Sequence, residues 1–192
     1  MNLDIAPEEA LKMYAKLLGR ATELTEGQKA RENFIDFVRG VWPEFIGGKH
    51  HSVMAEKFNR VAKGELKRLI VNMPPRHTKS EFASFLLPAW LMGRNPKLKI
   101  MQTTHTAELA FRFGRKVRNL MNTEDYSKVF EKVKLRADSQ AAGRWETSDG
   151  GEYFAAGVGG AVTGRGADLL IIDDPHSEQD ALNPNSFEHA YE

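Results

Sequence analysis

The residues best suited to chemistry begin with a lysine and a serine at the end of a short loop. The loop residues are Pro75, Arg76, His77, Thr78, Lys79 and Ser80. They predict a phosphate-binding loop, in which backbone N–H groups face an anion, Lys79 neutralises the outer phosphates and the Ser80 hydroxyl ligates Mg²⁺. Met73 and Thr78 stand where the pattern G-x-x-x-x-G-K-[ST] has glycine, so the match is incomplete. Taken alone, the segment could also be a solvated helix start with Ser80 as its cap.

Two neighbouring carboxylates, Asp173 and Asp174, form the second group. They follow the apolar run Leu169-Leu170-Ile171-Ile172, which predicts a central strand buried on both faces. Asp173 would hold Mg²⁺ directly or through water, and Asp174 would orient the attacking water. An isolated Asp-Asp-Pro is as readily a strand-ending turn. A strand-ending turn does not explain why the acidic pair follows a phosphate-loop candidate in the order typical of a nucleotide site. The loop and the acidic pair together favour a nucleotide site at the carboxyl ends of parallel strands.

Strands and helices around the loop must bring these two groups together. The apolar run from Leu69 to Val71, between charged residues and two prolines, predicts a buried strand directly before the loop. From Lys79 onward the pattern is helical, and Pro88 should kink or end this helix near Leu87. Residues 98–104 predict the next strand, which would close a right-handed strand-helix-strand unit.

The middle of the chain adds a basic helix and a hairpin. Residues 106–121 predict a helix whose basic residues lie largely off its apolar stripe, namely Arg112, Arg115, Lys116 and Arg118. This basic side is either a solvated face or a contact with the DNA backbone. A short strand is expected at residues 132–136, and Ser148-Asp149-Gly150-Gly151 predicts a hairpin turn. The glycine-rich stretch 157–166 precedes a strand rather than a helix, so it is not a dinucleotide-binding fingerprint.

The first 48 residues predict a helical lead-in without chemistry of its own. One helix should span residues 4–19 and stop at Gly19, and a second should start from a capping box of Thr25 and Gln28. A third helix is expected at residues 51–63 with Gly64 as its C-cap. The predicted division is a helical segment over residues 1–48 and a partial catalytic domain over residues 49–192.

Composition restricts the class of protein. With 192 residues, 41% hydrophobic and 28% charged, the chain suits one soluble α/β domain with a sizeable core. The absence of cysteine excludes disulfides and thiolate metal sites. No apolar run reaches membrane-spanning length, and the first 18 residues lack the pattern of a secretion signal, so we expect no membrane partner. The net charge of +1 gives no bulk attraction to nucleic acid, and any such contact must use local basic faces.

Three stretches together resemble the ATPase region of tailed-phage terminase large subunits, the motors that pump DNA into an empty capsid. They are residues 48–51 (Gly-Lys-His-His), residues 71–81 around the loop, and residues 160–176 around the acidic pair. The resemblance implies an α/β P-loop NTPase with a mostly parallel sheet flanked by helices, and ATP with Mg²⁺ as cofactors. As partners it implies double-stranded DNA, a homo-oligomeric ring on the portal protein and a small terminase subunit, in the host cell cytoplasm.

The resemblance also implies roles for residues outside the two groups. His51, and with it His50, lies in the segment that commonly helps to hold the adenine. Arg165 would reach the γ-phosphate of a neighbouring subunit as a trans-acting arginine, with Arg76 as the second candidate. Arg165 could equally just pair with Asp168.

The resemblance runs from about Phe34 to Glu192 and implies an incomplete sheet. In this ATPase type a further strand inserts between the acidic strand and the phosphate-loop strand, and we expect neither that strand nor the nuclease domain of the family within these 192 residues. We therefore expect unpaired backbone at the sheet edge and no nuclease activity. Two other functions stay open: a helicase-like nucleic-acid-dependent ATPase, and a catalytically inactive nucleotide-binding or scaffold fragment, which Met73 and Thr78 favour.

Overall fold

The computed structural model describes residues 7–160, 162 and 164–177, and within them the chain has an α/β fold with a mixed five-stranded sheet. Its helices are α1 (Pro7–Glu32), α2 (Phe34–Val41), α3 (Lys49–Ala62), the π-helical turn η1 (Glu81–Leu86), α4 (Leu87–Arg94), α5 (Ala107–Met121) and α6 (Glu124–Val129). Its strands are β1 (Lys99–Thr104), β2 (Leu135–Gln140), β3 (Arg144–Thr147), β4 (Glu152–Gly157) and β5 (Leu169–Ile172). The predicted α/β class is confirmed. No helix in the described part of the chain is long and apolar enough to cross a membrane.

The sheet has the strand order β2-β3-β4-β1-β5. β1 pairs in parallel with β4 on one side and β5 on the other, whereas β2, β3 and β4 pair antiparallel. The sequence predicted a mostly parallel sheet, and the difference arises because the short turn at residues 148–151 can join only antiparallel strands. That hairpin itself was predicted, and Gly150 adopts the positive φ (91°) that such a turn requires. The strand expected at residues 132–136 is β2, which begins at Leu135.

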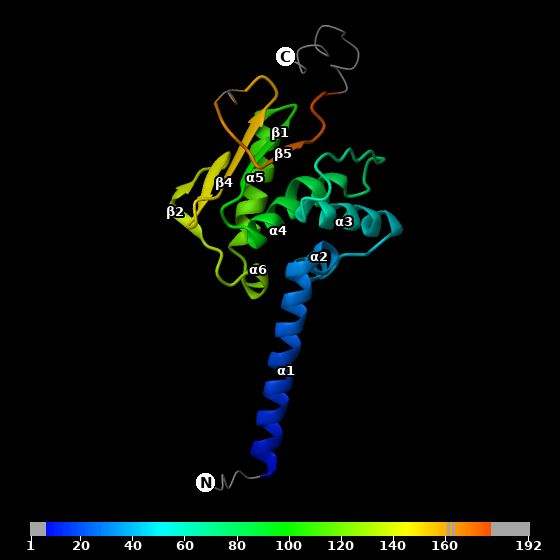
Figure 1. The fold of residues 1–192 in the computed structure, drawn as a ribbon, viewed down its shortest axis with the longest axis vertical. Helices are drawn as coiled ribbons and strands as arrows, with labels where there is room; N and C mark the ends of the chain where they lie inside the picture. The colour runs from blue at the N-terminus through cyan, green and yellow to red at the C-terminus, as the bar shows by residue number, and fades with distance from the viewer. Residues whose placement is uncertain (1–6, 161, 163, 178–192) are drawn as a thin grey trace.

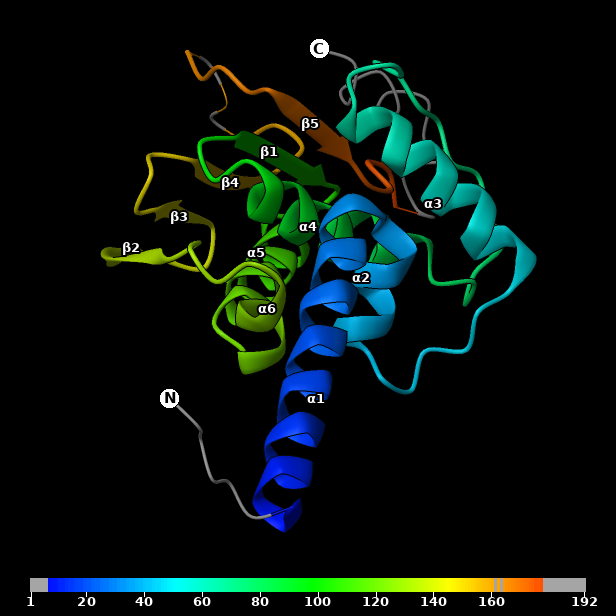
Figure 2. The same cartoon turned by 60° about the horizontal axis from the view of Figure 1, so that its bottom comes forward.

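Helices α4, α5 and α6 lie together on one side of the strands (Figure 2). α5 packs on β4 and β1, and the alternate residues of β1 (Ile100, Gln102 and Thr104) are buried, as in a strand with one covered face. The indole Nε1 of Trp145 in β3 donates to the carbonyl of Gly114 in α5 at 3.1 Å. This buried hydrogen bond ties the helix layer to the hairpin side of the sheet.

The core extends from the sheet to the helices on either side of the loop. Phe34 of α2 makes edge-to-face contacts with Phe58 of α3, Phe82 of η1 and Trp90 of α4, at centroid distances of 5.1, 5.5 and 5.5 Å. All four side chains are buried, so these contacts add to the stabilisation from apolar burial. α2 therefore belongs to the same core as the helix that follows the loop.

α1 is one continuous helix, whereas the sequence predicted a stop at Gly19 and a new start at Thr25. Glycine in a helix interior costs only about 1 kcal/mol relative to alanine, and good helix formers on both sides offset this cost. The Thr25 hydroxyl donates to the carbonyl of Ala21 inside the helix, so it does not act as a cap. The break comes instead at Asn33, whose side chain accepts from the N–H of Ile35 and caps α2. Figure 1 shows the N-terminal part of α1 extending away from the rest of the molecule.

The strand predicted at Leu69–Val71 does not form. Residues 66–74 are irregular, and the Ile70 side chain is 85% exposed. A strand needs a neighbour that supplies backbone hydrogen-bond partners, and no described strand pairs with this segment. β5 was expected in the centre of the sheet and buried on both faces, but it is an edge strand with Leu170 and Ile172 exposed.

The remaining predicted helices are present with shifted ends. α3 begins at Lys49, and Gly64 follows it with a φ of 75°; Thr106 caps α5. The helix after the loop does not end at Pro88: it widens into η1 and continues as α4. Proline lacks the N–H for a regular bond one turn back, and the π-helical turn directly before it accommodates this loss. The polar stretch of residues 176–192 favours a loop that leads into a helix, and its residues 178–192 lie outside the described residues.

Candidate functional site

The carboxyl end of β5 lies against the first residues of the helix that follows the loop. Lys79 Nζ is 2.5 Å from Asp174 Oδ1 and 3.4 Å from Asp173 Oδ1, although Lys79 and Asp174 are 95 positions apart in the sequence. The two groups of residues predicted to do chemistry are therefore neighbours in space. Since an ammonium has three donors, contact with two carboxylates leaves one donor for a further acceptor.

The two carboxylates, Asp173 and Asp174, stabilise the positive charge of Lys79. Asp173 is only 7% exposed, whereas the side chain of Asp174 is largely exposed. Burial lowers the pKa of Lys79, but the hydrogen bond to Asp174 and the charges of both carboxylates outweigh burial and raise that pKa above its usual value. Lys79 therefore remains a cation at physiological pH.

Asp173 also bonds a residue that the sequence analysis did not single out. Ser84 Oγ donates to Asp173 Oδ2 at 2.8 Å, and Ser84 is fully buried. With Lys79 near one oxygen and Ser84 on the other, the carboxylate is held in one orientation. The signal in the sequence was a polar residue inside an apolar helical run, four positions after Ser80 and hence on the same helix face.

The loop has a left-handed backbone at two non-glycine residues, Arg76 (φ 64°) and Thr78 (φ 59°). Such residues cost about 1–3 kcal/mol each and persist only where their surroundings hold them. His77 Nδ1 donates to the carbonyl of Pro75 at 2.9 Å, which closes the tip of the loop. This part of the chain therefore has a defined conformation without glycine.

The loop has donors to offer an anion. The backbone N–H groups of Arg76 and Thr78 have no acceptor among the described residues. The hydroxyl of Ser80 makes no capping hydrogen bond to the helix that it precedes. Ser80 therefore does not cap η1 through its side chain, and a solvated helix start stays as the alternative to a phosphate site.

Asp174, predicted to orient the attacking water, also has a left-handed backbone, with a φ of 44°. Its carbonyl accepts a hydrogen bond from the N–H of His105, the residue after β1, at 3.3 Å. Backbone strain of this kind clusters at functional sites. The bond to His105 holds the backbone of Asp174 at the carboxyl ends of β1 and β5.

His51 contacts the loop rather than open surface. It is 6% exposed, its Nε2 lies 2.6 Å from Thr78 Oγ1 and 3.0 Å from His50 Nε2, and its Nδ1 accepts from the N–H of Gly48 at 2.8 Å. Both ring nitrogens are engaged within the protein. The adenine contact implied for His51 stays a prediction, one that these hydrogen bonds do not favour.

Arg165 does not join the cluster at Lys79. Its Nη1 is 3.0 Å from Glu152 Oε1, and its guanidinium lies 4.1 Å from the centroid of the Phe154 ring. Glu152 opens β4, whereas Asp173 follows the end of the parallel strand β5. Arg165 thus lies toward the opposite end of the strands, and only a role in a neighbouring subunit remains as a prediction for it.

Asp168, the other partner considered for Arg165, has a different role. Its Oδ2 accepts from the backbone N–H of Lys99 at 2.8 Å. The acid therefore connects the start of β1 to the chain that leads into β5.

The basic side of α5 is partly used within the fold. Lys116 Nζ donates to both carboxylate oxygens of Glu81 at 2.6 Å and lies 4.6 Å from the centroid of the Phe85 ring. This residue ties α5 to η1. Arg112 and Arg115 are exposed, which is compatible with a solvated face and with a contact to a polyanion.

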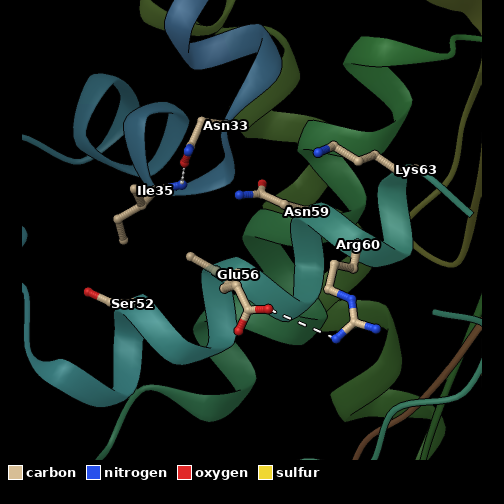
Figure 3. Close-up of a pocket in the computed structure, with 8 residues that line it drawn as sticks. Asn33, Ile35, Ser52, Glu56, Asn59, Arg60 and Lys63 are labelled. Atoms are coloured by element: carbon tan, nitrogen blue, oxygen red, sulfur yellow. Dashed lines mark hydrogen bonds and ion pairs between the residues drawn. The ribbon is translucent and has the colours of Figure 1, made fainter. Parts of the chain in front are cut away.

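A cavity of about 330 Å³ between α2 and α3 contains none of the predicted site residues (Figure 3). Its lining residues are Asn33, Ile35, Ser52, Ala55, Glu56, Asn59, Arg60 and Lys63. Several polar groups there already have partners: Asn33 caps α2, Asn59 Oδ1 accepts from the N–H of Phe34, and Glu56 faces Arg60 at 4.0 Å. We interpret this cavity as space between packed helices and not as part of the candidate site.

The donors and acceptors at the loop fit a magnesium-bound polyphosphate. The N–H groups of Arg76 and Thr78, which have no acceptor among the described residues, and the Lys79 ammonium suit phosphate oxygens. Asp173 and the Ser80 hydroxyl are oxygen ligands of the kind that Mg²⁺ prefers. The fold and this geometry define the class only as an α/β protein with a candidate anion site beside the end of β5. Comparison of the chain with protein-family models, with curated proteins and with solved structures found no match.

Proposed function

We propose that the chain is an ATP hydrolase, the ATPase module of a viral DNA-packaging motor of the terminase large-subunit type. The observation that carries the hydrolase part is the contact of Lys79 with Asp173 and Asp174. This contact lies next to a loop in which the N–H groups of Arg76 and Thr78 find no acceptor within the described part of the chain. Phosphoryl transfer depends chiefly on positioning and on stabilising charge. An ammonium, two carboxylates and several backbone donors within one cluster are the groups that this chemistry needs.

Each residue has a distinct role in this proposal. The N–H groups of the loop and Lys79 hold the β- and γ-phosphates, and Ser80 and Asp173 hold Mg²⁺. Bound Mg²⁺ would neutralise charge on the phosphate oxygens. Asp174, exposed and fixed by its strained backbone, orients the water that attacks the γ-phosphate. Ser84 keeps Asp173 in its orientation.

The motor part of the proposal rests on the resemblance of residues 48–51, 71–81 and 160–176 to terminase large subunits. Its partners would be double-stranded DNA, further copies of the chain in a ring on the portal, and a small subunit, in the host cytoplasm. Exposed Arg112 and Arg115 on α5 support a contact with the DNA backbone, because arginine can bind phosphate without reading sequence. Arg165 would complete the site of a neighbouring subunit.

The site assignment is tested by Lys79→Ala, with Lys67→Ala as a control that removes an exposed lysine from the segment before the loop. A charge-assisted hydrogen bond contributes about 1.5–3 kcal/mol, so Lys79→Ala should weaken the affinity for MgATP by about 10- to 100-fold. Calorimetry or a fluorescent ATP analogue measures the affinity, and phosphate release measures turnover. Unchanged affinity and turnover in Lys79→Ala would falsify the assignment.

Three outcomes separate the proposal from its alternatives. ATP turnover that is independent of DNA or stimulated by procapsids supports the motor. Strand separation on a forked duplex supports a helicase-like ATPase, which shares the same site residues. Affinity for MgATP without any turnover supports the inactive nucleotide-binding fragment, the alternative that Thr78 in place of glycine favours.

A further inference from the structure

Thr78 occupies a backbone conformation that favours glycine. Its φ is 59°, and it stands directly before Lys79, where the phosphate-loop pattern has its second glycine. A β-branched residue in this region is an outlier that does not persist without external support. The structure must therefore contain a group that holds Thr78 in place.

The imidazole of His51 is that group. Its Nδ1 faces the N–H of Gly48 at 2.8 Å and can only accept there, so the single proton of the neutral ring lies on Nε2. Nε2 is 2.6 Å from Thr78 Oγ1, and the hydroxyl in turn donates to the carbonyl of His77 at 2.7 Å. Nε2–H has a second acceptor within reach, His50 Nε2 at 3.0 Å, and the contact with Thr78 is the shorter of the two. The order of donors is thus Gly48 to His51, His51 to Thr78, and Thr78 to His77.

The ring itself cannot easily move. It packs against the rings of Phe45 and Phe82, each with a centroid distance of 4.8 Å, and it is 6% exposed. Gly48 is the N-cap residue of α3 and Phe82 belongs to η1, so the ring is fixed from both sides. A rigid donor is suited to hold a strained backbone.

We propose that His51 is a positioning residue of the phosphate loop. Its Nε2–H bonds to Thr78 and holds this residue in the left-handed region, a conformation that glycine would adopt without such a bond. The role of the loop in holding phosphate rests on the proposed function. In this role His51 acts through the backbone of the loop and needs no contact with the nucleotide. It keeps the N–H groups of residues 76–80 in the arrangement that binds the phosphates.

The competing explanation is that His51 only caps α3 through Gly48. Two substitutions separate the two roles, because the amide of asparagine occupies the place of Nδ1 and the amide of glutamine the place of Nε2. His51→Asn keeps an acceptor for Gly48 but loses the donor to Thr78. His51→Gln keeps a donor within reach of Thr78 but loses the acceptor for Gly48.

The experiment measures the affinity for MgATP of the full chain carrying His51→Asn or His51→Gln, each with and without Thr78→Gly. We expect His51→Asn to weaken the affinity about tenfold and His51→Gln by less than about threefold. In the Thr78→Gly background His51→Asn should cost less than about twofold, since glycine adopts a φ of 59° without an anchor. Equal effects of the two substitutions, or an undiminished loss in the Thr78→Gly background, would overturn the proposal.

The same four variants and their parents are also unfolded in urea without nucleotide. The cycle of His51→Asn and Thr78→Gly should show coupling in stability, because each substitution removes the same hydrogen bond. If the wild-type chain does not bind MgATP, the proposed function fails, and this cycle alone decides the anchor. Strictly additive effects on stability would then show that His51 does not hold Thr78.

Discussion

Ser84 donates a 2.8 Å hydrogen bond to Asp173 at a position from which solvent is excluded, and this contact joins the helix after the loop to the end of β5. The two residues are 89 positions apart. Asp173 is in addition 3.4 Å from Lys79. Its carboxylate is thus the point at which the loop, the helix and the sheet meet.

Replacing Ser84 by alanine should destabilise the protein, because Asp173 then keeps a buried oxygen without its donor. A hydrogen bond to a charged group contributes about 1.5–3 kcal/mol, and we expect a loss of about 2 kcal/mol in the free energy of unfolding. Urea denaturation measures this loss. Ser52→Ala, at an exposed position of α3, is the matched control and should stay within about 0.5 kcal/mol. A Ser84→Ala protein as stable as this control would mean that the bond contributes nothing.

Substitution of Asp174 should reduce ATP turnover, whereas substitution of Asp173 should affect the binding of Mg²⁺. Asp174→Asn should leave MgATP affinity within about threefold and lower turnover by at least about 100-fold, since it removes the group that orients water. Asp173→Asn should abolish the dependence of ATP affinity on Mg²⁺. Binding with and without Mg²⁺, together with phosphate release, measures both effects. Asp149→Asn in the exposed hairpin turn serves as the control, and wild-type turnover in Asp174→Asn would remove that residue from the mechanism.

Mixing two inactive variants tests whether Arg165 acts at the nucleotide site of a neighbouring subunit. Arg165 lies against Glu152 and far along the strands from Lys79, so a mixture of Arg165→Ala and Lys79→Ala chains should regain part of the turnover that each lacks alone. Mixed rings contain some sites with an intact Lys79 that face an intact Arg165. Absence of any recovery at several mixing ratios, with assembly verified by light scattering, would assign Arg165 to the fold alone.

Lowering the pH should destabilise the protein and its loop through His51. Burial, His50 and His77 lower the pKa of His51 below the ordinary value of 6.5. The titratable groups against the ring are His50 on α3 and His77 in the loop, since Phe45 and Phe82 carry no charge. A second proton would fall on Nδ1, which faces the N–H of Gly48.

The sign follows from proton linkage. Between pH 6.5 and the lowered pKa the unfolded chain binds a proton at His51 and the folded chain does not. The stabilisation is therefore complete above pH 6.5 and decreases as the pH falls toward the lowered pKa. Urea unfolding from pH 7.5 to 5 measures the decrease, and it should be smaller in His51→Gln. An equal slope in that variant would assign the pH dependence to other groups.

A truncation of Phe34 tests whether α2 belongs to the core of the site. Phe34 is fully buried and contacts Phe58, Phe82 and Trp90, so Phe34→Ala should cost about 3–5 kcal/mol. The control is Leu17→Ala on α1, where the side chain is 59% exposed and a change below about 0.5 kcal/mol is expected. Similar small effects of both substitutions in urea unfolding would show that α2 folds independently of the loop helix.

The sequence alone determined the elements whose stability is local. Thr106 with the periodic stripe after it predicted α5, and the glycines at 150 and 151 predicted the hairpin that joins β3 and β4. The run that ends at Asp173 and Asp174 predicted β5. In each case the signal lies within a few residues, because capping, turn geometry and periodicity act over one or two turns of chain.

The tertiary structure alone decided features that depend on distant neighbours. Leu69–Val71 has the composition of a strand, but no strand in the described part of the chain lies beside it to supply hydrogen-bond partners. The bond of Ser84 to Asp173 and that of His51 to Thr78 join residues from different elements. Backbone and side-chain hydrogen bonds of this kind form only when the fold brings both partners together, so no local pattern in the sequence specifies them.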